Sequence, residues 1–198
     1  PGSTFKLMSM AALIDDGYVK IDDMVNLEGG KKQYADRFME DDHHDANKND
    51  VTVSEAIAMS SNVAVSKLAL KYYGKNYDKF YNKLKSFHIT NPVGIEIEGE
   101  AIPVVYSTKK SSVSIPWMSI GYEVSLTPLQ TLTFYNTIAN NGKMMKPYLV
   151  SSIKEYDKVI KQFDPIVVDK AVIKENTVKS LKSMLVEVVE KGTARNIK

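Results

Sequence analysis

The sequence of 198 residues contains no cysteine. Disulfide bonds, a thiol nucleophile and cysteine-ligated metals are therefore excluded. The formal net charge is only +2, and the lysines are scattered along the chain instead of gathered in one segment. No electrostatic footprint for DNA or RNA is present, so we expect no nucleic-acid partner.

Long apolar runs are also missing. No stretch approaches the 18 consecutive apolar residues that indicate a membrane-spanning helix, and no signal peptide opens the sequence. The sequence starts at Pro1-Gly2 without a methionine, so we expect it to be a piece of a larger protein, with any export signal or membrane anchor outside it. A hydrophobic content of 43% suits a single globular domain over residues 1–198.

What the sequence does contain is a serine and a lysine at the start of an apolar segment. Ser3-Thr4-Phe5-Lys6 places a hydroxyl and an amine one helical turn apart, so the lysine can take a proton from a serine nucleophile. The same spacing recurs at Ser107 and Lys110 and at Ser151 and Lys154, in polar stretches. Spacing alone is therefore a weak signal, and the setting of the first copy matters more.

That setting is a segment, residues 5–14, which is apolar on nearly every face. It predicts a buried central helix from about residue 3 to residue 16, ended by Gly17. A lysine near the start of such a helix is partly desolvated, which lowers its pKa and favours the neutral, proton-accepting amine. Ser3 is therefore the candidate nucleophile and Lys6 the candidate base.

Ser60-Ser61-Asn62 is a second candidate element and the only S-x-N in the sequence. It lies at a predicted junction of two helices, where an irregular turn can aim side chains into a cleft. Standing alone, it would be better explained as a helix break capped by Ser and Asn. Beside a serine and a lysine, however, a hydroxyl from Ser60 can relay a proton to a leaving amine. The amide of Asn62 can then hydrogen-bond a substrate backbone.

The rest of the pattern predicts a helix-rich chain with too few strands for a large sheet. Helices are predicted over residues 52–59, 62–73, 76–87, 127–140 and about 178–188. Extended segments are predicted over residues 18–21, 24–27 and 94–97, with a hairpin over 147–163 and an otherwise irregular stretch over 92–126. Two of the helix starts carry capping signals, Thr52 with Glu55 and Thr127 with Gln130.

Three motifs together resemble a known family. Pro-Gly-Ser-Thr-Phe-Lys at residues 1–6, Ser-Ser-Asn-Val at 60–63, and Ser-Ile-Gly-Tyr at 119–122 leading into Leu-Thr-Pro-Leu-Gln at 126–130 resemble the class B penicillin-binding proteins. The order and spacing match that family across essentially the whole chain. Its members are transpeptidases that cross-link the bacterial cell wall. The Gly-Tyr pair is more similar to the division-specific members than to the elongation-specific ones.

One family motif has no counterpart. Lys-Thr/Ser-Gly, on a strand that walls the active site, does not occur, and Lys191-Gly192-Thr193 has similar letters in another order. The two sheet strands that precede the nucleophile helix in the family are absent too. The resemblance therefore implies an α-rich fragment of the α/β (α+β) penicillin-binding protein and serine β-lactamase fold, with few short strands. Without the sheet, we expect the first helix to be poorly buried and the fragment to be unstable or associated.

The resemblance also implies a reaction. Ser3 would attack the carbonyl between the two terminal D-alanines of a peptidoglycan stem peptide, with Lys6 as base. Ser60 would pass a proton to the departing D-alanine, and Asn62 would hold the peptide. A neighbouring stem peptide would then take the acyl group from Ser3, and β-lactam antibiotics would acylate the same serine. A backbone amide at the helix start would contribute to an oxyanion hole. Because the second donor lies on the missing strand, we expect the fragment alone to be nearly inactive.

The implied partners are stem peptides, β-lactams and, through the parent protein, membrane proteins of the division complex, with no cofactor. The implied location is the periplasmic face of the bacterial inner membrane. Two other functions stay open: a β-lactam-sensing receptor domain that holds the acyl group, and a non-catalytic interaction module. The Thr-Pro-Leu-Gln segment favours the transpeptidase over the sensor. The intact set of Ser3, Lys6, Ser60 and Asn62 argues against the module.

Two further features have simpler explanations. His43 and His44 lie among the aspartates of residues 41–45, and these residue types can bind a metal. Neighbouring histidines in so polar a loop are more often solvated, so no metal is expected. Trp117 and Tyr122 could line a ligand groove, but aromatic residues in a long irregular segment usually pack it down, and we favour packing.

Overall fold

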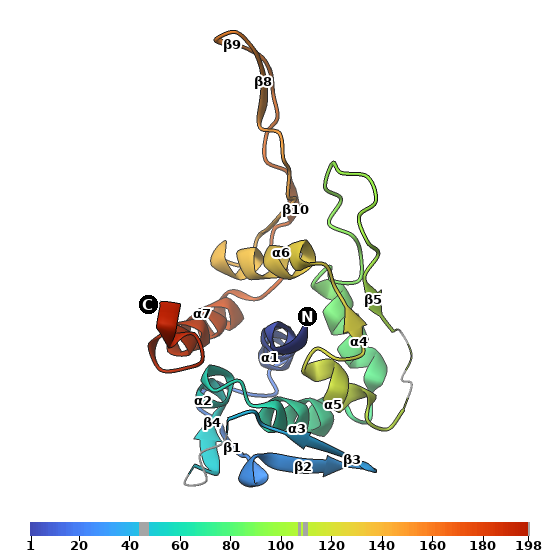
Figure 1. The fold of residues 1–198 in the computed structure, drawn as a ribbon, viewed down its shortest axis with the longest axis vertical. Coiled ribbons are helices and arrows are strands. Elements are labelled where there is room, and N and C mark those ends of the chain that lie inside the picture. Colours follow the sequence, from blue (N-terminus) through green and yellow to red (C-terminus); the bar gives the residue numbers. More distant parts are fainter. Residues whose placement is uncertain (44–47, 107, 109–110, 198) are drawn as a thin grey trace.

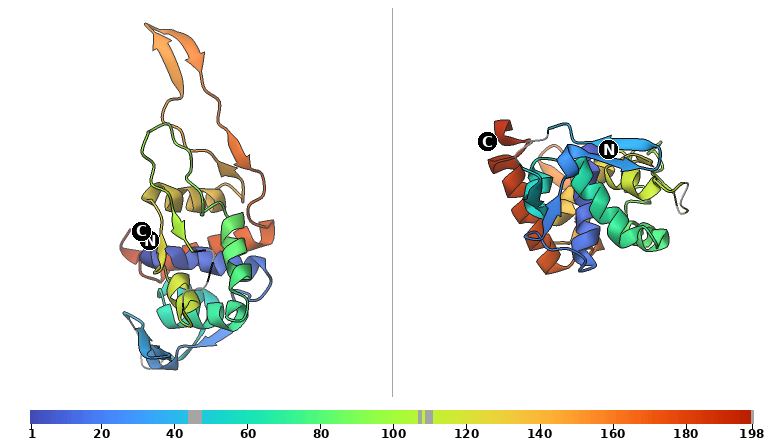
Figure 2. Two further views of the ribbon diagram at one scale, coloured as in Figure 1. Left: turned by 90° about the vertical axis from the view of Figure 1, so that its right-hand side faces the viewer. Right: turned by 90° about the horizontal axis from the view of Figure 1, so that it is seen from below.

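The structure is a computed structural model that describes residues 1–43, 48–106, 108 and 111–197. His44, Asp45, Ser107 and Lys110, which are named above, lie outside the described residues. The helices are arranged around one central helix, and a long hairpin projects from this helical body (Figures 1 and 2).

The central helix is α1 (Lys6–Asp15), preceded by a 3₁₀ turn, η1 (Gly2–Phe5). Every residue of α1 except Ile14 is buried, and neighbouring helices contact it along its length. The predicted central helix is therefore confirmed, with a tighter first turn than expected. The expectation that this helix would be poorly buried is wrong, because helices cover it without help from a sheet (Figure 1). Exposure of α1 therefore gives no reason to expect an unstable fragment.

Six further helices surround α1. They are α2 (Val53–Ala58), α3 (Asn62–Tyr73), α4 (Tyr77–Ser86), α5 (Ser114–Ser119), α6 (Pro128–Ala139) and α7 (Glu175–Glu190), and a 3₁₀ turn, η3 (Arg195–Ile197), follows. Both predicted capping boxes are present, because Thr52 and Thr127 each bond reciprocally with the residue three positions on. Among the described residues, no helix is both long and apolar enough to cross a membrane.

The strands are short and pair only two by two within the described residues, always antiparallel. The pairs are β1 (Met24–Asn26) with β4 (Asp50–Thr52), β2 (Lys31–Tyr34) with β3 (Arg37–Glu40), β5 (Val104–Val105) with β6 (Val124–Ser125), β7 (Met144–Met145) with β10 (Val167–Asp169), and β8 (Ser152–Glu155) with β9 (Lys158–Gln162). A 3₁₀ turn, η2 (Glu28–Gly30), joins β1 to β2. The prediction of a helix-rich fold with few short strands is confirmed, as is the hairpin within residues 147–163.

Three local predictions are wrong. Residues 18–21 and 94–97 form no strand, and residues 114–119 of the stretch read as irregular form α5. Near the second segment, the carboxylate of Glu100 accepts the backbone amides of Val93 and Gly94, at 2.6 and 2.8 Å. The backbone amides of Val93 and Gly94 therefore have their acceptors within the loop and do not need a neighbouring strand.

A buried polar cluster fastens the C-terminal end of α1 to α4 and to the start of α7. The Asp15 carboxylate accepts the Lys83 ammonium at 2.5 Å and the Lys174 backbone amide at 2.9 Å. The exposed fractions of the Asp15 and Lys83 side chains are only 5% and 17%. Burial by itself would raise the pKa of Asp15, but hydrogen bonds from Lys83, Lys174 and Thr177 hold it below its ordinary value.

Asp15→Ala should lower the free energy of unfolding by about 1–3 kcal/mol at pH 7, because it removes a buried carboxylate that accepts the Lys174 amide and pairs with Lys83, although Lys83 keeps Asp16 as a partner at 3.1 Å. The lowered pKa means that the wild-type protein keeps this contribution above about pH 4 and loses it as the pH falls further. The difference between the two proteins should therefore shrink toward pH 2. Urea denaturation at several pH values measures it.

The matched control is Glu175→Gln, which removes a carboxylate that pairs with Lys179 at the exposed surface of α7. An exposed pair contributes little, so this variant should unfold almost as the wild-type protein does. Equal losses in the two variants would contradict a special role for the buried cluster.

Candidate active site

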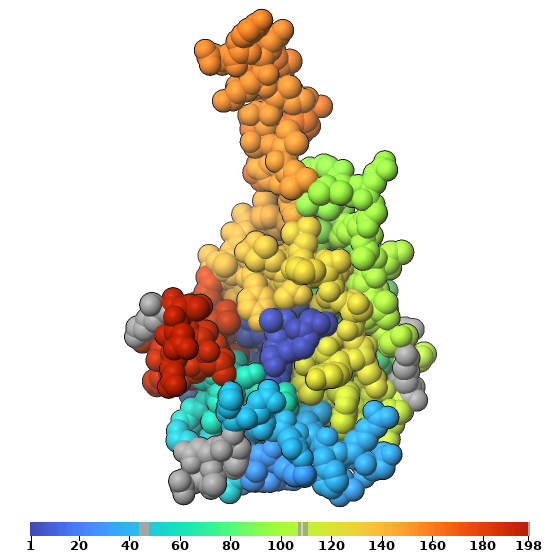
Figure 3. Space-filling view, viewed as in Figure 1, coloured from blue at the N-terminus to red at the C-terminus, as the bar shows by residue number. Residues whose placement is uncertain are grey.

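The candidate nucleophile lies at the surface, at the open end of the central helix. Ser3 is an exposed residue of η1, and in the space-filling view the blue N-terminal residues lie at the surface among segments from several parts of the chain (Figure 3). The Tyr135 hydroxyl donates to the Thr4 carbonyl at 3.0 Å and ties this turn to α6. Within the described residues, the Ser3 hydroxyl makes no hydrogen bond, and so none to Lys6.

The candidate base is buried one turn further along. Lys6 is only 3% exposed, and its Nζ donates to the Ser60 carbonyl at 2.5 Å and to the Ser60 hydroxyl at 2.9 Å. Burial lowers the pKa of Lys6 to about 8, against the opposing charges of Asp41 and Asp42. The predicted desolvated lysine with a lowered pKa is confirmed.

The turn that carries Ser60 is a helix C-cap in an unusual conformation. At the end of α2, the Ser60 amide bonds to the Ile57 carbonyl at 3.0 Å, and the Ser61 amide bonds to the Ala56 carbonyl at 2.8 Å. These two bonds form a Schellman motif, in which the residue in the place of Ser60 is usually glycine. Ser60 takes φ +59° there, in the left-handed region. The strained conformation brings both oxygens of Ser60 to Lys6.

Asn62, the last residue of the S-x-N motif, is held by the end of β3. Asn62, the first residue of α3, donates its side-chain amide to the Glu40 carbonyl at 2.7 Å. Asp41, the residue that follows β3, accepts the Ser61 hydroxyl and the Val63 backbone amide, at 2.7 and 2.9 Å. From its sequence context Asp41 is only one residue of a polar loop, so this contact was not predicted. The sequence carries no local signal for it, because 20 residues separate the partners.

The third motif contacts η1, the turn that carries Ser3, directly. Gly121 takes φ +91°, and a Cβ atom at this position would lie 2.1 Å from the Gly2 carbonyl oxygen. Only a glycine lets the two backbones come so close. The Ser9 hydroxyl of α1 donates to the Ser119 carbonyl at 2.8 Å. The Ser-Ile-Gly-Tyr segment therefore positions the residues before Ser3 and contacts α1 itself.

The segment Lys191-Gly192-Thr193 packs against the end of α2, next to the turn that carries Ser60. The Thr193 amide donates to the Ala58 carbonyl at 3.1 Å, and a Cβ atom on Gly192 would lie 2.2 Å from that oxygen. The end of α7 is thus fixed against the end of α2, two residues before Ser60.

Of the two other candidate features, the structure describes the aromatic pair in full and the loop of residues 41–45 only as far as His43. Trp117 packs edge-on against Tyr34, with ring centroids 5.9 Å apart, so the packing interpretation is correct for this residue. Tyr122 is 61% exposed, which does not fit it. Of the residues that the structure describes, no three His, Cys, Asp or Glu lie close enough to hold a metal ion.

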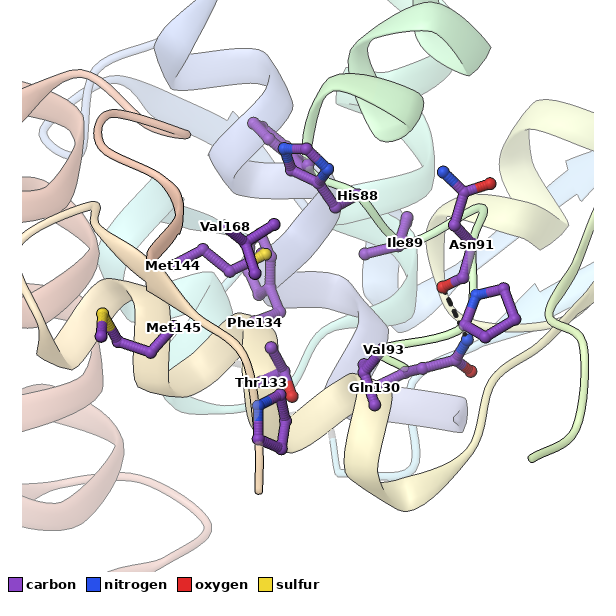
Figure 4. Close-up of a pocket in the computed structure, with 13 residues that line it drawn as sticks. His88, Ile89, Asn91, Val93, Gln130, Thr133, Phe134, Met144, Met145 and Val168 are labelled. Carbon is purple, nitrogen blue, oxygen red and sulfur yellow. Dashed lines mark hydrogen bonds between the residues drawn. The ribbon is translucent and has the colours of Figure 1, made fainter. Parts of the chain in front are cut away.

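A separate cavity of about 230 Å³ lies beside α6 (Figure 4). Its walls come from the chain after α4, from α6, and from β7 and β10, and they include Phe87, Phe134 and Met144. The Gln130 side chain crosses one edge and donates to the Asn91 carbonyl at 3.1 Å. None of Ser3, Lys6, Ser60 or Asn62 lines the cavity, so the candidate chemistry belongs to the surface site at the start of α1.

Comparisons with known proteins agree on one family. The family model described as the penicillin binding protein transpeptidase domain matches residues 1–198. Stage V sporulation protein D of Bacillus subtilis is 27% identical over 99% of this chain and 30% of its own length. Peptidoglycan D,D-transpeptidase FtsI of Buchnera aphidicola is 31% identical over 73% of this chain and 24% of its own length. The chain thus spans less than a third of these relatives.

Solved structures share the fold. The apo transpeptidase domain of penicillin-binding protein 3 from Burkholderia pseudomallei superposes with a TM-score of 0.82 at 22% identity, covering 100% of this chain and 56% of that one. Penicillin-binding protein 3 of the tubercle bacillus, complexed with aztreonam, gives a TM-score of 0.79 at 23% identity. This match covers 96% of the present chain and 41% of the other one. At these identities the likeness concerns the fold alone.

Gly121→Ala should destabilise the protein by roughly 2–4 kcal/mol, because the methyl group overlaps the Gly2 carbonyl and the backbone is left-handed. The control is Gly99→Ala, which has a similar φ of +84° and no atom within 4 Å of the added methyl group. Thermal or urea unfolding of both variants separates the steric clash from the backbone strain. A loss no larger in Gly121→Ala than in Gly99→Ala would contradict the close approach.

Ser60→Gly and Ser60→Ala should differ in stability by about 1 kcal/mol in favour of glycine, because only alanine keeps the left-handed strain. Both variants lose the hydroxyl that accepts from Lys6, so proton relay should slow by roughly 100-fold or more in either. Urea unfolding and the acylation rate of Ser3 measure the two effects. An acylation rate in both variants equal to that of the wild-type protein would mean that the hydroxyl has no part in the reaction.

Proposed function

Because the chain belongs to the penicillin binding protein transpeptidase domain family, we propose that the protein carrying it is a serine-type peptidoglycan D,D-transpeptidase of the division-specific type. The family predicted from the three sequence motifs is thereby confirmed. The reaction that we propose joins stem peptides of the bacterial cell wall through an acyl-serine intermediate. The observation that carries it is the buried Lys6 amine, which lies on α1 one turn after an exposed serine.

The contacts of Lys6 support its role as the base. A neutral lysine amine has two N–H groups and one lone pair, and both N–H groups are used by the oxygens of Ser60. The lone pair is then left to take the proton of Ser3. With a pKa of about 8, roughly a tenth of Lys6 is neutral at pH 7. That fraction suits a general base near neutral pH.

The reaction balances with these groups. The Oγ atom of Ser3 attacks the carbonyl carbon between the two terminal D-alanines and forms an ester as its proton passes to Lys6. The carbon–nitrogen bond breaks, and the Ser60 hydroxyl gives a proton to the departing D-alanine while Lys6 returns one to Ser60. An amine of a second stem peptide then attacks the ester and forms the new amide as the carbon–oxygen bond to Ser3 breaks, and the proton that the amine loses passes through Lys6 to the Oγ atom of Ser3. In this scheme Asn62 holds the donor peptide.

β-Lactams fit the same proposal, because their strained amide stands in for the D-Ala-D-Ala bond. The aztreonam complex of a structurally similar protein supports a binding site for such compounds. We further propose that the protein acts at the periplasmic face of the inner membrane, anchored by a segment outside residues 1–198. We also propose that it works with membrane proteins of the division complex. Its substrates are stem peptides, and it needs no cofactor.

We propose that residues 1–198 alone react slowly, since an oxyanion-hole donor on a Lys-Thr-Gly strand is not among them. Loss of one such donor typically reduces the rate roughly 100- to 1,000-fold. A β-lactam sensor remains the second candidate, because the same Ser3, Lys6 and Ser60 cluster would form its acyl-enzyme. Release of D-alanine from a stem pentapeptide by the longer protein, with transfer to an acceptor, would favour the transpeptidase; a stable acyl-enzyme without release would favour the sensor.

The central test is intact-mass analysis after incubation with a penicillin, on a protein in which residues 1–198 are joined to the strands that complete the family's sheet. We expect one covalent adduct per molecule, and none in Ser3→Ala. The matched control is Ser151→Ala, which removes the serine of another S-x-x-K copy and should leave the adduct in place. A folded protein without an adduct would overturn the enzyme and sensor proposals and leave the interaction module.

A further inference from the structure

We propose that Asp41 is the positioning residue of this site: it fixes the turn between α2 and α3 so that Ser60 stays on Lys6, and its charge acts on the Lys6 amine. The proposal rests on the proposed function for its meaning in catalysis. Its contacts are independent of that function. Asp41 directly follows β3, and it lies far along the sequence from both α1 and the α2–α3 turn.

The carboxylate of Asp41 uses each oxygen for a different part of the turn. Oδ2 accepts the Ser61 hydroxyl at 2.7 Å, and Oδ1 accepts the Val63 backbone amide at 2.9 Å. The Ser61 hydroxyl also accepts the Ala64 amide at 3.0 Å and so caps α3. Asp41 therefore holds the N-terminal turn of α3 at two points, on either side of Asn62.

The preceding residue strengthens the same attachment. The Glu40 carbonyl accepts the Asn62 side chain at 2.7 Å, and the Glu40 carboxylate pairs with Lys31 across β2 and β3 at 2.5 Å. All three residues of the S-x-N motif are thus constrained: Ser60 by α1, and Ser61 and Asn62 by the end of β3. A serine held at φ +59° needs such surroundings, because the conformation is unfavourable by itself.

The charge of Asp41 adds an electrostatic effect. Among the described residues, the carboxylates of Asp41 and Asp42 are the charged groups that act on Lys6, and both favour its protonated form. Burial acts the other way and is the larger effect. Asp42 is exposed and makes no hydrogen bond to the turn within the described residues, whereas Asp41 makes two. Comparing variants of Asp41 and Asp42 therefore distinguishes the effect of a nearby charge from the effect of the hydrogen bonds.

An ordinary helix cap would explain the contact to Val63 but not an effect on Lys6. A cap stabilises α3 and leaves the ionisation of a lysine on α1 unchanged. The two explanations therefore differ in a quantity that can be measured directly, the titration midpoint of the Lys6 side chain.

The first experiment is an NMR titration of the 198-residue chain with ¹³C-labelled lysine, in which the Lys6 signal is assigned by its loss in Lys6→Met. Asp41→Asn keeps the shape of the side chain and removes its charge, so the midpoint of Lys6 should fall below that of the wild-type protein. Asp42→Asn should lower it as well. Asp36→Asn, an exposed carboxylate at the tip of the same β2–β3 hairpin, should leave it unchanged.

Amide hydrogen exchange on the same proteins tests the contact. Asp41→Asn should reduce protection of the Val63 and Ala64 amides by roughly tenfold or more, because a charged acceptor is replaced by a weaker one. Asp42→Asn should not. If Asp41→Asn changes neither the midpoint nor the protection, the proposal is overturned. If it lowers protection without moving the midpoint, Asp41 is a helix cap only, which also overturns the proposal.

The second experiment measures penicillin acylation against pH in the longer protein. The wild-type rate should rise through the Lys6 midpoint, near pH 8, because the neutral amine is the reactive form. In Asp41→Asn the rise should move to lower pH and the plateau should fall by roughly 10- to 100-fold, with partial rescue by Asp41→Glu. Absence of wild-type acylation together with the expected titration shifts would refute the proposed function and leave the role of Asp41 intact. An unchanged plateau and midpoint in Asp41→Asn would refute the role of Asp41 alone.

Discussion

The arrangement of this site depends on a buried lysine amine and the two oxygen atoms that satisfy it. Lys6 lies at the start of a helix that is buried almost throughout, and a buried amine without acceptors is strongly unfavourable. Ser60 supplies both acceptors from another part of the chain. The start of α1 and the α2–α3 turn are therefore bound to each other, and whatever holds the turn also sets the environment of the lysine.

Several features around this contact are unfavourable for stability when taken alone. Ser60 occupies a left-handed position that suits glycine, and Lys6 is buried. Gly121 also has a positive φ, and the absence of a side chain lets its backbone lie in close contact with that of Gly2. Such departures gather where side chains must be held in a reactive arrangement, and the surrounding contacts must compensate for them. Here the compensation comes from Asp41 and from a core of packed helices.

The two ends of the central helix are held by different means. At the C-terminal end, Asp15 pairs with Lys83 inside a buried polar cluster, which fixes α1 against α4 and α7. At the N-terminal end, η1 is held by backbone contact with Gly121 and by the bond from Tyr135. Ser3, the candidate nucleophile, thus lies at the surface on a helix that is held at both ends, although the described strands form only two-stranded sheets.

From the amino-acid sequence we could predict the helices with strong periodicity and clear caps, the three motifs and the family that they indicate. These are local properties, because a capping box or an S-x-x-K spacing acts within one or two helical turns. The sequence also indicated a desolvated lysine, since an apolar segment surrounds Lys6. The tertiary structure alone decided the left-handed conformation of Ser60, the contact of Gly121 with Gly2 and the role of Asp41. It also decided the burial of α1 without a sheet. Each of these joins groups that lie far apart in the chain, and no local preference specifies which distant surface will cover a given residue.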